Sequence, residues 1–219
     1  MIKELIDEFY RKKQNNKGQV AFYATDSGRC PRAIYFSMKN YPKKESDARV
    51  MRIFEHGDHT HMRIMAVLFS LGLVTAAEIS IPENEVVRGR ADAIISFKGE
   101  PYVVEIKSVN SVKFKKNEPD FDHIRQLQLY LYFFNIKKGI LIYENKDNQD
   151  LKEFVIEYDE NIVKKSISFF NSLKENVEKS IIPEIPKDIE DWRCEYCPYV
   201  VECEKVEEQK NSKKGQLSL

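Results

Sequence analysis

One stretch, from Gly89 to Lys107, limits the fold of this chain more than any other. Residues 93–97 and 102–107 are rich in β-branched and aromatic side chains, as strands are. The four residues between them, 98–101, include a glycine and a proline and have the composition of a turn. The stretch therefore predicts a β-hairpin, and the rest of the chain must supply a sheet and a core around it.

Three charged residues, Asp92, Glu105 and Lys107, interrupt these apolar strands. Because side chains alternate between the two faces of a strand, Glu105 and Lys107 share a face. Carboxylates and an ammonium group that are buried together destabilise a fold unless a partner compensates them. A divalent cation held by the carboxylates is one solution. A half-exposed hairpin whose charges face water is the other, and these residues alone do not separate the two.

Helical and extended patterns follow one another along the rest of the chain. Apolar residues recur at helical spacing in residues 2–13, 30–36, 47–71, 123–134 and 159–180. Alternating or β-rich segments occur at 76–81, 139–143 and 153–158, in addition to the hairpin. This order predicts an α/β fold with a central mixed β-sheet flanked by helices.

The length of 219 residues fits a single domain. Its expected parts are an N-terminal helical part (1–75), a core (76–180), a C-terminal cysteine segment (181–203) and a charged, frayed tail (204–219).

Lysine plus arginine equals aspartate plus glutamate, at 35 each. The net charge of zero gives no global attraction to nucleic acid, so any such surface must be a local patch. No apolar run reaches the ~20 residues of a membrane span, and the polar N-terminus is unlike a signal peptide. We therefore expect a cytoplasmic protein with no membrane partner, in which cysteines are reduced thiols or metal ligands.

The four cysteines form a second candidate site. Three of them, Cys194, Cys197 and Cys203, have the spacing C-x2-C-x5-C, and Cys30 lies near the other terminus. Four thiolates can hold zinc or an iron–sulfur cluster. Structural zinc usually takes its ligands from two short pairs, so the pattern favours a 4Fe-4S cluster that ties the C-terminal segment to Cys30, with zinc as the alternative.

With these pieces in place, the sequence resembles the PD-(D/E)XK nuclease superfamily. Within it, the pattern is similar to RecB-like iron–sulfur exonucleases of the CRISPR-associated Cas-four type, and to the AddB nuclease domain and viral relatives. The resemblance rests on residues 57–61 (GDHTH), 89–92 (GRAD), 105–107 (EIK) and 126–130 (QLQLY), together with the four cysteines. Ala91 stands where the superfamily name has proline.

The resemblance implies a restriction-endonuclease-like core and a Mg2+ or Mn2+ site. Its metal ligands would be the side chains of His61, Asp92 and Glu105 and the backbone carbonyl of Ile106. Lys107 would act with Asp92 and Glu105 in catalysis, assisted by Gln126 and Tyr130. Without the resemblance, His61 is more often a core residue and Tyr130 an ordinary packing residue, and His123 is expected to be a capping or surface residue.

Basic residues near the predicted site suggest where DNA would bind. These are Arg90, Lys113, Lys115 and Lys116. A solvated loop is the commoner explanation of such a lysine run.

The expected function is a metal-dependent deoxyribonuclease, an exonuclease with endonuclease activity left open, that acts on single-stranded DNA or DNA ends. The resemblance leaves three points open. They are whether the chain associates with itself, whether it binds partner proteins of recombination or CRISPR systems, and whether it is a viral protein in the host cytoplasm. The rival interpretation is an iron–sulfur or zinc-stapled DNA-binding or adaptor protein whose nuclease site is vestigial.

Overall fold

The structure is a computed structural model that describes residues 1–14 and 17–216. Two compact units make up the chain. We call Met1–Val20, Cys30–Arg52 and Leu173–Leu219 the terminal unit, and Ala21–Arg29 with Ile53–Ser172 the sheet unit. Their boundaries differ from the four parts expected from the sequence, and the single domain stays a prediction.

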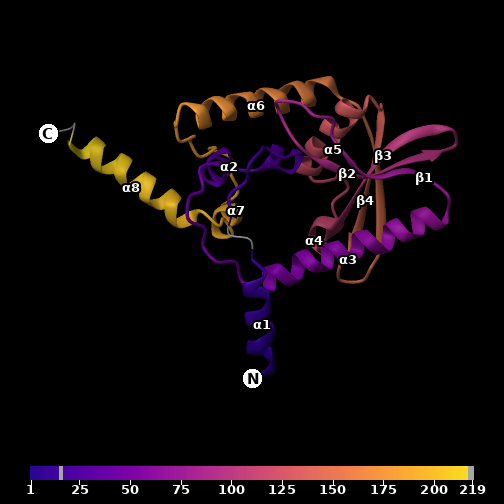
Figure 1. Ribbon diagram of the computed structural model, residues 1–219, viewed down its shortest axis with the longest axis horizontal. Helices are drawn as coiled ribbons and strands as arrows, with labels where there is room; N and C mark the ends of the chain where they lie inside the picture. Colours follow the sequence, from indigo (N-terminus) through magenta and orange to yellow (C-terminus); the bar gives the residue numbers. More distant parts are fainter. Residues whose placement is uncertain (15–16, 217–219) are drawn as a thin grey trace. The chain divides into compact units, whose positions relative to one another are not determined.

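The sheet unit contains a five-stranded sheet in which the strands follow their sequence order (Figure 1). The strands are β1 (Val74–Ser80), β2 (Arg90–Phe97), β3 (Glu100–Val109), β4 (Lys138–Asn145) and β5 (Leu151–Glu157). β3 and β4 are parallel, and the other neighbours are antiparallel. The predicted mixed sheet and α/β class are confirmed.

The β2–β3 hairpin has a shorter turn than the sequence predicts. Only Lys98 and Gly99 lie between the strands, with φ of 51° and 81°. Two-residue hairpin loops of this kind need positive φ at both positions, which matches the right-handed twist of the strands. The expected turn residues Glu100 and Pro101 belong to β3. Pro101 is tolerated there because pairing of β3 with β4 begins only at Val103.

Helices cover both faces of this sheet. From α3 (Ala48–Ser70), Ile64 and Met65 pack on a strand face. That face consists of Ala93, Ile95, Val104, Ile106 and Ile140. Side-chain alternation places Glu105 and Lys107 on the opposite face, where α5 (Phe121–Phe134) contributes Gln126.

Further helices complete the sheet unit. They are the 3-10 helix η1 (Ala24–Gly28), the four-residue helix α4 (Ser111–Phe114) and α6 (Glu160–Glu178), which continues into the terminal unit. α4 was not expected from the sequence. Among the described residues, no helix is long and apolar enough to cross a bilayer.

The terminal unit is helical. Its helices are α1 (Ile2–Lys12), α2 (Pro31–Met38), α7 (Asp191–Glu195) and α8 (Val200–Gln216). Phe36 and Tyr199 are buried there, with ring centroids 5.9 Å apart. The tail expected from residue 204 is helical as far as residue 216, where α8 continues through it, and ion pairs such as Lys205–Glu202 support the first turns of this helix. Residues 217–219 of that expected tail lie outside the described residues.

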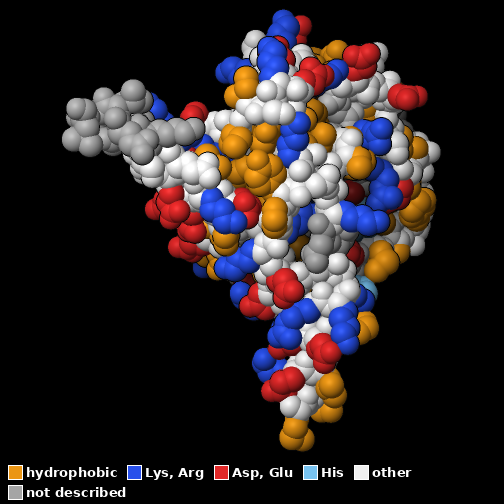
Figure 2. All heavy atoms as spheres, turned by 60° about the vertical axis from the view of Figure 1, so that its left-hand side comes forward, with side chains coloured by type: hydrophobic (Ala, Val, Ile, Leu, Met, Phe, Trp, Pro, Cys, Tyr) orange, Lys and Arg blue, Asp and Glu red, His pale blue; other side chains and the backbone are white. Residues whose placement is uncertain are grey.

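The apolar stripe of α1 is exposed. The helix expected at residues 2–13 is present, but Leu5 and Phe9 are 62% and 55% exposed. Figure 2 shows hydrophobic side chains at the surface of this helix, at the bottom of the view, and positive and negative side chains interspersed elsewhere on the face shown.

Candidate active site and cysteine site

The candidate active site lies where β2 parts from β3. Pairing between these strands ends at Ala93 and Val104, so Asp92, the residue that precedes Ala93 in β2, is not paired with β3. The backbone N–H of Ile106 donates instead to Oδ2 of Asp92, at 2.7 Å. Since this N–H is satisfied by a side chain rather than by a strand, the Asp92 carboxylate is held at the separation point with Oδ1 left for other contacts.

His61 of α3 meets two carboxylates at this point. Its Nδ1 lies 3.3 Å from Oδ1 of Asp92, and its Nε2 lies 2.8 Å from Oε1 of Glu78. One donor atom from each of the three residues lies within 4.8 Å of the others. The structure thus brings the predicted pair His61 and Asp92 together. His56 and His59 of the same helix are exposed.

Glu78 is the residue that sequence reasoning missed. Between the paired residues Ala77↔Ala93 and Ile79↔Ala91, Glu78 of β1 falls opposite Asp92 of β2. Its φ of 53° is unusual for a residue with a side chain. The available signal was its charge within an otherwise apolar strand segment, the same signal that drew attention to Asp92.

Glu105, Lys107 and Gln126 form a buried hydrogen-bonded network. Nζ of Lys107 lies 2.7 Å from Oε1 of Glu105 and donates to Oε1 of Gln126 at 2.9 Å. Nε2 of Gln126 donates to the same Glu105 oxygen at 2.7 Å. The second oxygen of Glu105, Oε2, is buried and has no hydrogen-bond partner among the described residues. Gln126 therefore contacts the lysine that it is predicted to assist.

The two central carboxylates have raised pKa values. Burial raises the pKa of Glu105 to about 7; Asp92 adds to the shift, while Lys107 and Gln126 oppose it. Burial also raises the pKa of Asp92, against the stabilising effects of the Ile106 N–H, His61 and Lys107. Buried carboxylates resist ionisation unless a positive charge is placed beside them, so these groups favour a cation.

Tyr130 and Arg90 lie beside the site, and each contacts protein groups there. The Tyr130 hydroxyl is buried, accepts from Gln126 Nε2 and donates to the carbonyl of Arg90, both at 3.1 Å. This arrangement agrees with the packing interpretation of Tyr130, which supports Gln126. Arg90 has an exposed side chain whose Nε lies 2.6 Å from Oε2 of Glu78.

The lysine run at residues 113–116 is not part of this cluster. Nζ of Lys113 lies 2.5 Å from Oδ2 of Asp120, the N-cap residue of α5. Lys115 and Lys116 are exposed. A role of the run in DNA binding stays a prediction.

His123 differs from the expectation of a capping or surface residue. It is half-buried in the first turn of α5, and its Nδ1 lies 2.5 Å from the Tyr143 hydroxyl. The cap is Asp120 instead. Burial lowers the pKa of His123 to about 3, and the positive charges of Lys107 and Lys113 act in the same direction while Asp120 opposes them.

The donor set fits a hard divalent cation. Carboxylate oxygens with one imidazole suit Mg2+ or Mn2+, and the imidazole shifts the preference toward Mn2+. Oε2 of Glu105 is buried and accepts no hydrogen bond from the described residues, which leaves it able to face a cation. The carbonyl of Ile106 as a further ligand stays a prediction.

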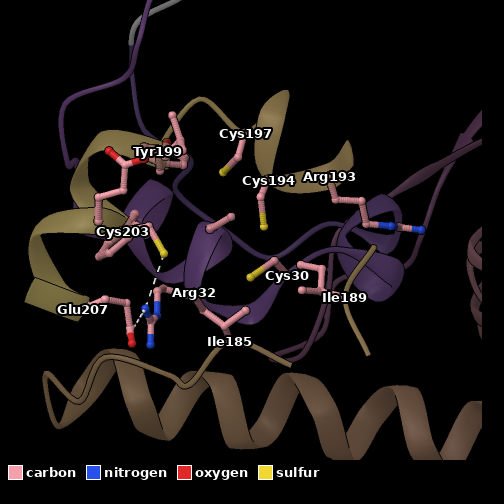
Figure 3. Close-up of a pocket in the computed structure, with 14 residues that line it drawn as sticks. Cys30, Arg32, Ile185, Ile189, Arg193, Cys194, Cys197, Tyr199, Cys203 and Glu207 are labelled. Atoms are coloured by element: carbon pink, nitrogen blue, oxygen red, sulfur yellow. Dashed lines mark hydrogen bonds and ion pairs between the residues drawn. The ribbon is translucent and has the colours of Figure 1, made fainter. Parts of the chain in front are cut away.

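The four cysteines surround a cavity of about 250 Å3 in the terminal unit (Figure 3). Cys30 is the N-cap of α2, Cys194 lies in α7, Cys197 precedes α8 and Cys203 lies within α8. No disulfide bond joins these cysteines within the described part of the chain. Burial raises the pKa of Cys194, and Cys30 and Cys203 raise it further because their negative charges lie nearby.

Arg32 is a buried cation beside this cavity. Its side chain is 1% exposed. It donates from Nη1 to Sγ of Cys203 at 3.4 Å and to Glu207 at 2.6 Å, and from Nε to the carbonyl of Pro183 at 2.7 Å. A positive charge at this position favours thiolates over thiols. Four converging sulfur atoms and a compensating cation fit either an iron–sulfur cluster or zinc.

The order of motifs, the sheet and the carboxylate site agree with a comparison against protein families. The model of the PD-(D/E)XK nuclease superfamily matches residues 4–204. The chain belongs to this superfamily. It is therefore a nuclease by family, and its mixed sheet is the restriction-endonuclease-like core of PD-(D/E)XK proteins.

Individual PD-(D/E)XK relatives extend the comparison. The CRISPR-associated exonuclease Cas4 of Saccharolobus solfataricus is 28% identical over 216 residues, which cover 91% of this chain and 98% of the relative. The crystal structure of SSO0001 matches with a TM-score of 0.57 and 25% identity, over 92% of this chain and 95% of that one. A phage-related exonuclease from Haemophilus somnus 129PT shares the fold, with a TM-score of 0.54 at 10% identity over 74% of this chain and 95% of that one.

Proposed function

We propose that this PD-(D/E)XK protein is a divalent-metal-dependent DNA nuclease that acts on single strands or DNA ends and carries a structural 4Fe-4S cluster. The observation that carries the catalytic part is the network in which Gln126 holds Lys107 against Glu105, beside the Asp92–His61 pair. Burying an ammonium group and two carboxylates together costs free energy of folding, and in a vestigial site no activity would offset this cost. The similarity to an exonuclease of CRISPR systems supports DNA as the substrate.

His61, Asp92 and Glu105 would hold the cation. When bound, Mg2+ or Mn2+ lowers the pKa of a water molecule and offsets negative charge on the phosphate. The protein side chains then have separate tasks. Asp92 is fixed by the N–H of Ile106, so its free oxygen keeps a constant direction toward His61.

Lys107 positions the attacking water and stabilises the negative charge that develops on the phosphate. Gln126 restricts the Lys107 ammonium group to one side of Glu105, and Tyr130 restricts Gln126 in turn. Such fixed orientation reduces the reorganisation needed in the transition state. Arg90, whose guanidinium is exposed, would meet a phosphate outside the metal position.

Cleavage of labelled single-stranded DNA with Mn2+ tests the catalytic proposal. Asp92→Ala and Lys107→Ala should each abolish Mn2+-dependent degradation while the variants remain folded. Lys98→Ala, in the hairpin turn, is a matched control that should cleave at the wild-type rate. Cleavage by both active-site variants at the wild-type rate would overturn the assignment and favour the rival DNA-binding or adaptor function.

End-labelled linear and circular single strands distinguish the modes of attack. We expect degradation of linear DNA with Mg2+ or Mn2+. An exonuclease leaves circles intact, whereas cleavage of circles establishes endonuclease activity.

The proposed cluster would be bound by Cys30, Cys194, Cys197 and Cys203. Protein purified without oxygen should contain iron and absorb near about 400 nm. Zinc without iron would instead establish the zinc alternative.

The proposal places the protein in the cytoplasm with DNA as its substrate. Association with itself or with proteins of CRISPR or recombination systems follows from the family pattern and is tested by co-purification.

A further inference from the structure

Glu78 has no counterpart among the residues that the motifs single out, yet it lies in the candidate metal site. We propose that Glu78 is a direct ligand of the divalent cation, which is then held by three carboxylates and one imidazole. This inference rests on the proposed metal dependence and adds a ligand from β1.

The distances around His61 support direct ligation. Neighbouring ligands of an octahedral ion bound at about 2.1 Å lie about 3.0 Å apart. Oε1 of Glu78 lies 2.8 Å from Nε2 of His61, close to that separation. With Asp92 included, one donor atom from each of the three residues lies within 4.8 Å of the others, a spacing that a single ion can span with small side-chain shifts.

The backbone places two negative charges opposite each other at this point. Strand register sets Glu78 across from Asp92, and like charges at opposed positions destabilise a sheet. The positive φ of Glu78 is a second local cost, because residues with a Cβ disfavour this region. A cation between the carboxylates converts this unfavourable arrangement into a ligand set.

A second observation favours a cation on the neighbouring strand β3. Oε2 of Glu105 is buried and lacks a hydrogen-bond partner among the described residues, and Glu105 is 4% exposed. A buried carboxylate oxygen without a donor calls for a positive group beside it. Glu105 directly precedes Ile106, whose N–H holds the Asp92 carboxylate, so the chain brings these two acidic residues to the same part of the sheet.

Arg90 leaves one oxygen of Glu78 for the metal. Its Nε lies 2.6 Å from Oε2 of Glu78, on the oxygen that does not face His61. Oε1 is thereby directed to the imidazole and, in the proposal, to the cation. The arginine holds the glutamate as a positioning residue and does not occupy the metal position.

Binding of Mn2+ by Glu78→Gln tests the inference. We expect the variant to bind Mn2+ about 10- to 100-fold more weakly, measured as free Mn2+ by electron paramagnetic resonance. Water-proton relaxation of the bound Mn2+ should show one additional inner-sphere water, because water replaces the lost carboxylate. Glu83→Gln removes the same charge from an exposed position after β1 and should change neither quantity.

The outcomes are distinct. Unchanged affinity in Glu78→Gln overturns the inference, and so does a weaker affinity without an additional water, which would make Glu78 a positioning residue for His61. Glu78→Asp, which keeps the charge, should recover part of the affinity, and this separates lost ligation from misfolding. A wild-type protein that binds no Mn2+ would overturn the proposed metal dependence itself.

Discussion

Gln126 holds Lys107, the proposed catalytic lysine, from a helix that is remote in sequence. Gln126→Leu removes one hydrogen bond from Lys107 and one from Glu105. Hydrogen bonds to charged groups contribute about 1.5–3 kcal/mol, so we expect the cleavage rate to fall about 10- to 100-fold. Single-turnover cleavage at saturating Mn2+ measures this change.

Gln128, two residues further along α5, provides the matched control. It is also buried, but it donates to the carbonyl of Glu157 at 2.7 Å and accepts from the N–H of Asp159 at 2.8 Å, away from the site. Gln128→Leu should reduce stability and leave the cleavage rate of the folded protein unchanged. Equal rate losses in both variants would mean that Gln126 acts only through stability.

His123 should make folding stability depend on pH. Its folded pKa is about 3, below the unfolded value of about 6.5, so below pH 6.5 the unfolded chain takes up a proton that the folded protein does not. The contribution of His123 to the free energy of unfolding is therefore complete above pH 6.5. It is lost as the pH falls toward 3, by about 1.4 kcal/mol per pH unit.

Urea unfolding of His123→Gln between pH 7.5 and pH 4.5 measures this contribution. The variant keeps hydrogen-bonding groups beside Tyr143 but does not titrate. Its stability curve should be shallower than that of the wild type by roughly 2 to 3 kcal/mol over the range. Parallel stability curves would mean that the pKa of His123 is the same in the folded and the unfolded protein.

The sequence was most informative about residues that carry a charge within an apolar strand. Asp92, Glu105 and Lys107 were recognised in this way, and the family pattern added His61. Glu78 carried the same signal but belongs to a strand outside the motifs, and its position opposite Asp92 depends on strand register, which no local pattern contains. The burial of the Tyr130 hydroxyl likewise depends on how α5 packs.

At the scale of whole elements, a glycine in β4 sets how closely α5 approaches the sheet. A Cβ at Gly139 would lie 2.8–3.0 Å from side-chain atoms of Leu127, which is fully buried and cannot move aside. We expect Gly139→Ala to destabilise the protein by about 1–3 kcal/mol. Because the displaced helix also carries Gln126, cleavage should slow as well. Urea unfolding and the cleavage assay measure both effects.

Gly57 in α3 is the control for that substitution. A Cβ there would meet no atom within 4 Å. Gly57→Ala should stabilise the protein by about 1 kcal/mol, since alanine favours helix over glycine. If Gly139→Ala were equally stabilising, the close approach of Leu127 would not limit the packing of α5.

The long elements were predictable because apolar residues recur about every 3.6 residues in a helix and every 2 residues in a strand. The boundaries of α3 and α5 fall within a few residues of their expected positions. Short or charged elements lack such a period. α4 has only four residues, and the two-residue turn of the hairpin is set by positive φ at Lys98 rather than by composition.

At the scale of the whole molecule, we expect the stability of the terminal unit to depend on Arg32. Arg32→Met would leave Glu207 and the carbonyl of Pro183 without their buried partner, a loss of about 1–3 kcal/mol because Glu207 itself is partly exposed. It would also remove the positive charge beside Cys203. We expect a lower unfolding temperature and less iron per chain.

Lys210→Met separates these effects from a simple change of charge. Lys210 pairs with Glu184 and Glu207 in the same network, but it is partly exposed. Iron content and absorbance near about 400 nm should stay at wild-type values in this variant. An Arg32→Met protein with full iron content would contradict the role of the arginine at the cysteines.

The division into two units was not visible in the sequence, because the terminal unit combines three separate segments. Periodicity describes neighbours along the chain and carries no information about which distant helices share a core. The cysteine spacing did indicate that residue 30 lies near residues 194–203, and the shared cavity confirms that proximity.

Because the terminal unit combines segments from both ends of the chain, the two units become complete at different times during translation. All segments of the sheet unit have been translated by Ser172, whereas the terminal unit waits for Leu173–Leu219. Domains generally fold as units during synthesis, so the sheet can form while the last cysteines are still in the exit tunnel. A chain that ends just before residue 194 would contain every proposed ligand of the divalent cation but only one of the four cysteines.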